Sequence, residues 1–257
     1  ITMSKHTENF EKNFAKCVGS KFALMVNSGS SANLIALFTS INPMHKKPLK
    51  RGDEVIIPAI CWSTSLWPII QAGLKPVFVD VDMDTLNISV EELNNKITKK
   101  TKAIMCVHIL GLSSDMWAIK RICTERKLIL FEDTCESLGS RFNNKDLGTF
   151  GNYGTYSFYY SHQITSGEGG MVVFNDKISY NIGKSLRSHG WSRGTSFHNE
   201  YAKKYKNLNN KFLFINSGFN LRPTDVQAAI ANNQLKRLNK FKFIRNQNRN
   251  KIIASIK

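Results

Sequence analysis

The sequence predicts an α/β fold in which a mostly parallel central sheet is covered by helices on both faces. Short runs of β-branched and aromatic residues alternate along the chain with stretches of helical length. The short runs are apolar throughout, which is the pattern of strands buried on both faces. Alternation of strands and helices is typical of parallel sheets with helical crossovers. No internal repeat or Pro-rich linker interrupts residues 1–235.

The expected elements follow from turn residues and apolar runs. A Ser/Gly-rich stretch after position 26 separates the first strand from a helix. Gly73 is expected to end another helix as its C-cap. The expected strands are residues 22–26, 54–57, 76–81, 103–108, 128–131, 156–158 and 171–174. The expected helices are residues 31–39, 63–72, 114–126, 224–238 and 241–256, the last two broken at Asn239.

The charge is strongly positive and unevenly distributed. The 257 residues hold 36 Lys and Arg against 19 Asp and Glu, a formal net charge of +17. Eight of the basic residues lie at positions 236–257, which hold no acid. A solvated basic helix explains this run without nucleic acid, and a polyanionic small substrate such as a nucleotide sugar fits the sign of the charge equally well. We expect no nucleic-acid partner.

The spacing of the cysteines and the hydropathy of the chain narrow the class of protein further. The five cysteines are scattered, with no CxxC pair, so neither a disulfide framework nor a metal site is expected. The apolar runs are of strand length, far short of the roughly 20 residues that a membrane span needs. The first residues lack the pattern of a signal peptide. The prediction is a cytoplasmic protein that does not bind membranes.

Polar groups that follow the strands are the candidate ligand-binding residues, because ligands of such folds bind beyond the carboxyl ends of the strands. Gly29 and Ser30 lie in a small turn that opens a helix, a pattern that suits an anion such as phosphate. A plain Ser-capped helix would have the same sequence. Trp62 follows the next apolar run and could stack on a planar ring or pack in the core.

Asp133 follows the buried run 128–131. A carboxylate there is costly unless it meets a cation, and a protonated pyridine nitrogen would be one. A helix cap or a salt bridge would explain Asp133 equally well. The stretch 156–170 then places Ser157 and His162 in a polar, glycine-rich turn between two strands.

Together these stretches resemble the DegT/DnrJ/EryC1/StrS sugar aminotransferases, which are fold-type I enzymes that use pyridoxal phosphate. The resemblance extends from about residue 10 to residue 249. It implies a three-layer large domain like that of aspartate aminotransferase. The motifs that carry it are residues 27–33, 52–62, 76–87, 131–139, 157–170 and 218–238.

The resemblance assigns part of the candidate site to the cofactor phosphate. Gly29 and Ser30 match the phosphate-binding turn, and Ser157 matches a serine that contacts the phosphate. Asn220 matches an asparagine that the family lends to the phosphate site of its dimer partner. The resemblance therefore implies a homodimer.

Three further residues match positions around the pyridine ring. Trp62 matches the aromatic residue that stacks on the ring, and Asp133 matches the acid that pairs with the ring nitrogen. Glu136 matches a polar residue near the ring hydroxyl. No metal ligand is implied.

His162 departs from the aminotransferase pattern. It occupies the position of the lysine that binds the cofactor covalently as a Schiff base. Imidazole has no primary amine, but it can accept or give a proton near neutral pH. A histidine at this position is similar to the nucleotide-sugar 3-dehydratases of 3,6-dideoxysugar and lipopolysaccharide biosynthesis. That subgroup uses pyridoxamine phosphate, with glutamate as the expected amino donor, and expels the C3 hydroxyl of a 4-keto-6-deoxy nucleotide sugar.

Within this subgroup, one type binds an iron–sulfur cluster through cysteines that precede residues 218–224. Residues 187–218 contain no cysteine. We therefore expect no iron–sulfur cluster and a closer similarity to the cluster-free type of the colitose pathway. Residues 186–191 are more like the aminotransferases, so a sugar aminotransferase that uses glutamate stays open. A non-catalytic relative that binds the cofactor is a further alternative.

The resemblance also divides the chain. Residues 1–238 correspond to the cofactor-binding large domain, with the N-terminal arm of the family missing. Residues 239–257 correspond to the start of the helix that leads to a C-terminal small domain, which is absent from the sequence.

Overall fold

A seven-stranded sheet forms the centre of the protein in a computed structural model, which describes residues 2–256. The strands of this sheet are β1 (Phe22–Val26), β2 (Glu54–Pro58), β3 (Lys75–Val79), β4 (Thr101–Val107), β5 (Ile129–Asp133), β8 (Tyr153–Ser157) and β9 (Gly170–Phe174). A separate hairpin consists of β6 (Arg141–Phe142) and β7 (Lys145–Asp146). The helices are α1 (Lys5–Val18), α2 (Gly29–Ser40), α3 (Ser63–Gln71), α4 (Val90–Lys96), α5 (Met116–Arg126), α6 (Lys177–Arg187), α7 (His198–Lys204), α8 (Asp225–Leu235) and α9 (Leu238–Ile256).

The sheet is mostly parallel, as the sequence predicts. The strand order is β1-β9-β8-β5-β4-β2-β3, and β3, β2, β4, β5 and β8 pair in parallel. Only β9 runs the other way among these strands, since it is antiparallel to both β1 and β8. The carboxyl ends of β1, β8, β5, β4 and β2 therefore lie at one edge of the sheet.

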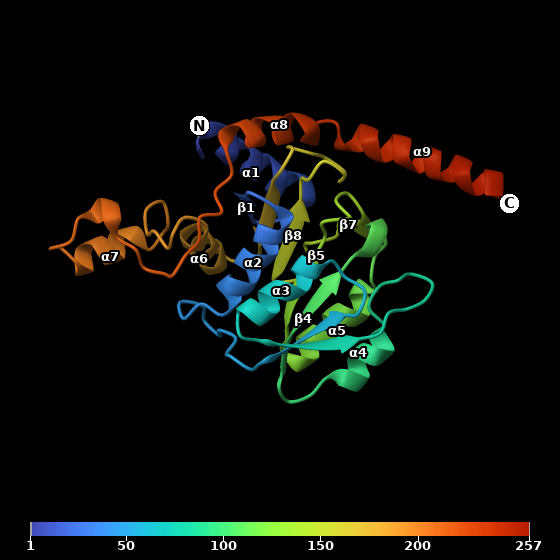
Figure 1. Ribbon diagram of the computed structural model, residues 1–257, viewed down its shortest axis with the longest axis horizontal. Coiled ribbons are helices and arrows are strands. Elements are labelled where there is room, and N and C mark those ends of the chain that lie inside the picture. Colours follow the sequence, from blue (N-terminus) through green and yellow to red (C-terminus); the bar gives the residue numbers. More distant parts are fainter. Residues whose placement is uncertain (1, 257) are drawn as a thin grey trace.

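Helices cover both faces, and successive side chains of a strand enter opposite layers. On β5, Phe131 packs in the layer formed with α2, α3 and α6, whereas Leu130 packs in the layer formed with α4 and α5. A third cluster joins α1 and α8 to β1, β8 and β9. Figure 1 shows the sheet between these helices. Burial on both faces explains why most positions of the central strands are apolar.

The last two helices differ from the sequence prediction. The chain interrupts them at Lys236 and Arg237, so Asn239 lies inside α9 and is not the point of the break. Thr224 caps α8 through a capping box with Gln227. Asp225 in its first turn accepts the backbone N–H of Thr7 at 3.0 Å and so ties α1 to α8. Figure 1 shows α9 extending from α8 beyond the body of the fold.

Some predicted bounds also shift. β5 runs to Asp133, so this residue ends the strand and does not follow it. β8 begins at Tyr153 and ends at Ser157, one residue before the predicted end. α2 begins two residues early, at Gly29, because Ser28 caps it. Among residues 2–256, no helix is both long and apolar enough to cross a membrane.

Candidate active site

A cavity of about 390 Å³ lies at the edge where the parallel strands end. Its walls come from the turn after β1, the first turns of α2 and α3, the ends of β4, β5 and β8, and the turn between β8 and β9. The structure brings together seven of the eight residues singled out in the sequence. They are Gly29, Ser30, Trp62, Asp133, Glu136, Ser157 and His162.

The first turn of α2 forms one wall. Ser28 caps the helix, since its side chain accepts the N–H of Ser31 at 3.1 Å and its carbonyl accepts the N–H of Ala32 at 3.0 Å. Gly29 and Ser30 precede these two donors, in the part of a helix where N–H groups have no intrahelical acceptor. The hydroxyl of Ser30 also donates to Thr64 Oγ1 at 3.0 Å, which joins this turn to the start of α3.

Gly29 lies in a position that only glycine fits. A β-carbon there would be 2.6 Å from Cβ of Ser157 and 3.0 Å from Sγ of Cys135. The absence of a side chain therefore lets the first turn of α2 approach the end of β8. It also leaves backbone N–H groups and the Ser157 hydroxyl at the same place, a combination that suits an anion.

Asp133 is 5% exposed at the base of the cavity. Its Oδ2 accepts two side-chain hydrogen bonds, from Asn33 Nδ2 at 2.7 Å and from Ser65 Oγ at 2.6 Å. Its Oδ1 accepts the N–H of Cys135 at 3.1 Å. The carboxylate is thus held from three directions, and it is buried without a cation among the described residues.

Trp62 lies at the mouth of the cavity as the residue before α3. It is 70% exposed and does not belong to the core clusters of the described chain. Of the two sequence interpretations, packing in the core is wrong for this tryptophan. An indole that lines a cavity and faces solvent is free to cover a flat ligand.

His162 and Glu136 also line the cavity. Glu136 Oε2 accepts the N–H of Leu110 at 2.8 Å. The backbone of His162 is held at both ends, because its N–H donates to Tyr159 O at 3.1 Å and its carbonyl accepts Arg245 Nη2 at 3.3 Å. Burial lowers the pKa of the imidazole below 6.5, while the charges of Glu136 and Asp133 act in the opposite direction. Its neutral form therefore prevails at neutral pH.

Asn220 is the predicted residue that the structure keeps away from the cavity. It is exposed, forms an isolated bridge with Ser188, and accepts Arg222 Nε at 3.0 Å. Nothing in the fold of one chain turns it toward Asp133 or Ser157.

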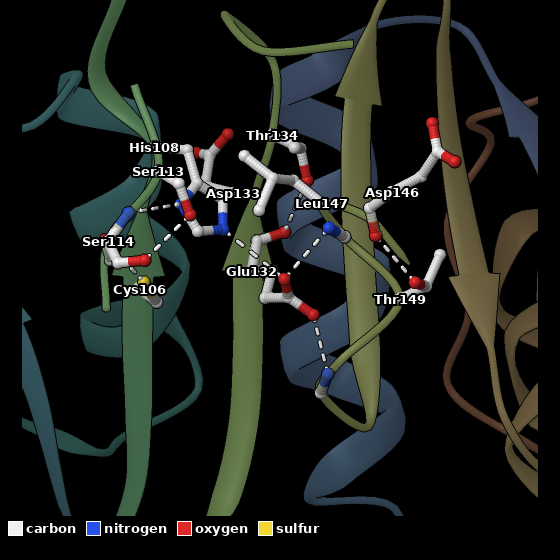
Figure 2. A network of polar contacts seen from close by, with 12 residues as sticks. Cys106, His108, Ser113, Ser114, Glu132, Asp133, Thr134, Asp146, Leu147 and Thr149 are labelled. Carbon is white, nitrogen blue, oxygen red and sulfur yellow. Dashed lines mark hydrogen bonds and ion pairs between the residues drawn. The ribbon is translucent and has the colours of Figure 1, made fainter. Parts of the chain in front are cut away.

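A buried network behind the cavity fixes the ends of β4 and β5 (Figure 2). Glu132 is fully buried, and its carboxylate accepts the N–H groups of Gly148 at 2.8 Å and Gly151 at 2.6 Å. His108 Nε2 lies 3.3 Å from the same carboxylate. Because His108 Nδ1 accepts the N–H of Ser114 at 3.3 Å, the ring proton is on Nε2 and points at Glu132.

Asn33 and Ser65 are the residues of the site that the sequence interpretation missed. Both are almost completely buried, and both contact Asp133 directly. The signal that could have found them is polarity inside helices that are otherwise apolar at the sheet. Buried side chains of this kind need partners, and a carboxylate at a strand end is one.

Comparison with known proteins agrees with this geometry. GDP-4-keto-6-deoxy-D-mannose 3-dehydratase of Escherichia coli is 44% identical over 254 residues, which are 96% of this chain and 64% of that protein. GDP-perosamine synthase of Vibrio cholerae is 36% identical over 92% of this chain and 59% of its own length. A solved structure of the Escherichia coli dehydratase with bound hydrated PLP has a TM-score of 0.88 at 42% identity, over 97% of this chain and 64% of that one.

The chain thus spans less than two thirds of the length of these relatives. Its α/β fold with a mostly parallel central sheet is that of fold-type I enzymes, as the sequence predicts. The sequence pattern of one enzyme family matches residues 1–256, almost the entire chain. The protein belongs to the DegT/DnrJ/EryC1/StrS aminotransferase family.

Proposed function

We propose that this chain is the cofactor-binding part of a sugar 3-dehydratase that uses pyridoxal or pyridoxamine phosphate. Its substrate would be a 4-keto-6-deoxy nucleotide sugar, and a GDP-linked sugar is the first to test, since two relatives of that name are 44% and 43% identical. The observation that carries the proposal is His162, which faces the cavity where the aminotransferases of the family have lysine.

The residues of the cavity fit this cofactor. The glycine-only approach of α2 to Ser157 leaves donors for a phosphate, and Trp62 offers its face to the pyridine ring. The uncompensated, buried carboxylate of Asp133 suits a protonated ring nitrogen. No lysine lines the cavity, so we propose that the cofactor is held without a covalent bond.

When bound, the cofactor supplies an electron sink for loss of the sugar hydroxyl. The protein residues would hold the ring and move the protons. Asp133 would keep the ring nitrogen protonated by accepting a hydrogen bond from its N–H. The neutral imidazole of His162 would take a proton from the reacting carbon and give it to the departing hydroxyl, which leaves as water; the held backbone of His162 keeps the ring beside the cavity. Trp62 covers the ring and excludes water from one face.

We propose a cytoplasmic homodimer in which Asn220 completes the phosphate site of the partner subunit. Support comes from its exposure and its distance from the cavity of its own chain. The free, buried thiols of Cys106 and Cys123 fit a reducing compartment. We also propose that residues 1–238 form the large domain and that 239–257 begin the connection to a small domain.

One experiment separates the dehydratase from a sugar aminotransferase. The full-length protein is given GDP-4-keto-6-deoxymannose, glutamate and pyridoxal phosphate, and the mass of the sugar product is measured. Loss of the C3 oxygen supports the proposal. Replacement of the keto oxygen by an amino group identifies an aminotransferase, and the absence of any product with intact cofactor binding identifies a non-catalytic relative.

A further inference from the structure

The carboxylate of Asp133 has one lone-pair position left for a ligand. Oδ2 already accepts two donors, Asn33 Nδ2 and Ser65 Oγ, so both of its lone pairs are used. Oδ1 accepts only the N–H of Cys135. Because Asp133 lines the cavity, the remaining position on Oδ1 is the one that a ligand can reach.

The amide of Asn33 can lie in only one orientation. Its Oδ1 accepts the hydroxyl of Thr155 at 2.6 Å, while its Nδ2 donates to Asp133 and to the carbonyl of Thr64 at 3.2 Å. A rotated amide would place its oxygen against the carboxylate of Asp133. The amide is therefore fixed by β8 and by α3 at the same time, and it fixes Asp133 in turn.

Ser65 supports the same oxygen from α3. It is fully buried, and its hydroxyl lies 2.6 Å from Oδ2 of Asp133. The carboxylate is thus held between two helices, α2 and α3, on the face of the sheet opposite to the Glu132 network. Loss of either donor would remove one of the three hydrogen bonds that fix the direction of Oδ1.

We propose that Asn33 and Ser65 are positioning residues that aim Oδ1 of Asp133 at the nitrogen of a protonated heterocycle. The inference rests on the proposed function for the identity of that heterocycle. The two oxygens of the carboxylate would then have different roles. Oδ2 is held by the protein, and Oδ1 recognises the ligand. This arrangement therefore contributes selectivity for a ring that bears an N–H.

A pair of ligands isolates this effect from general damage to the site. Pyridoxal phosphate and its deaza analogue, in which a carbon replaces the ring nitrogen, share the phosphate and the ring shape. Only the first can donate an N–H to Asp133. The ratio of their dissociation constants measures the contribution of the Asp133 contact, whereas a merely distorted cavity weakens both ligands alike and leaves the ratio unchanged.

The experiment measures this ratio by calorimetry for the full-length wild type and for Ser65→Ala and Asn33→Leu. We expect the preference for pyridoxal phosphate over the deaza analogue, expressed as the ratio of dissociation constants, to fall about tenfold in each variant. This is the loss typical of one hydrogen bond to a charged group. Thr39→Val is the control. Thr39 is also buried in α2, and its hydroxyl has no hydrogen-bond partner among the described residues, so its ratio should equal that of the wild type.

An unchanged ratio in Ser65→Ala overturns the inference, whatever happens to the absolute affinities. If Asn33→Leu does not fold, Ser65→Ala decides alone. A wild type that binds neither ligand refutes the proposed function and the inference together. A wild type that prefers pyridoxal phosphate while Ser65→Ala keeps that preference refutes the inference alone.

Discussion

Glu132 and Asp133 are consecutive residues of β5, yet their carboxylates lie on opposite faces of the central sheet. Glu132 faces the loop of Gly148 and Gly151, and Asp133 faces α2 and α3. The strand pleat imposes this separation. One carboxylate is satisfied entirely by the fold, whereas the other retains a position for a ligand. Substitutions of the two acids should therefore have different consequences.

Glu132→Gln should destabilise the fold by about 3 kcal/mol, because the amide nitrogen would meet backbone N–H donors in a fully buried place. Urea denaturation measures the change. Glu125→Gln is the matched control, since Glu125 is exposed and pairs with Arg121 at 4.0 Å, a surface contact of little energetic value. Equal stability of the two variants would contradict the importance of the buried network.

Asp133→Asn should leave the fold intact and lower the dehydration rate by about a hundredfold or more, because the ring nitrogen loses the acceptor that keeps it protonated. Steady-state turnover of the full-length enzyme, saturated with cofactor, checks this. Circular dichroism serves as the control for folding. Wild-type turnover in the variant would remove Asp133 from its assigned role.

His162→Asn should abolish dehydration while cofactor binding survives, because an amide cannot take up the proton. His162→Lys should instead attach the cofactor covalently and absorb in the visible. Borohydride treatment followed by mass spectrometry should find a phosphopyridoxyl-lysine adduct in this lysine variant and none in the cavity of the wild type. Dehydration by His162→Asn at the wild-type rate would make His162 a structural residue.

The pH dependence of His162 has a defined sign. Burial lowers the pKa of the imidazole below 6.5, and the base requires the neutral form. The neutral form should therefore persist below pH 6.5 and disappear only as the pH falls through the lowered pKa. An NMR titration of the imidazole signal, assigned by its loss in His162→Asn, measures the midpoint. A midpoint above 6.5 would mean that Glu136 and Asp133 outweigh burial.

Shared sites can be tested by mixing two inactive proteins. In a heterodimer of His162→Asn and Asn220→Ala, one of the two sites receives a wild-type residue from each chain. Activity should return to about a quarter of the wild-type level after random subunit exchange, since half of the dimers carry one intact site. Exchange is verified by mass spectrometry. No recovery after exchange would show that Asn220 does not act across an interface.

The sequence allowed much of this site to be predicted, because the alternation of strands and helices and the chemistry of turns are local. Gly29 and Trp62 lie shortly after an apolar run, and Asp133 lies at the end of one. Parallel strands bring such residues to the same edge of the sheet. Asn33 and Ser65 could not be placed in this way. They lie inside helices, and their meeting at Oδ2 depends on how α2 and α3 pack on β5.

The helix break before α9 and the role of Asn220 could not be predicted from local sequence patterns. The break between α8 and α9 falls at Lys236 and Arg237, where neither glycine nor proline marks it, so the predicted break at Asn239 is wrong. The role of Asn220 depends on a second chain and stays a prediction. Both cases require information about packing that residue spacing does not contain.

The pairing of the first strand with the last has a consequence for biosynthesis. β1 lies at the edge of the described sheet, and Phe22 is opposite Phe174, so β1 cannot form this pairing before the much later residues of β9 have been synthesised. Contacts so distant in the chain form slowly. The turn of Gly29 follows β1, and both Ser157 and His162 precede β9. We therefore expect the walls of the cavity that these two segments form to come together only after β9 has been synthesised.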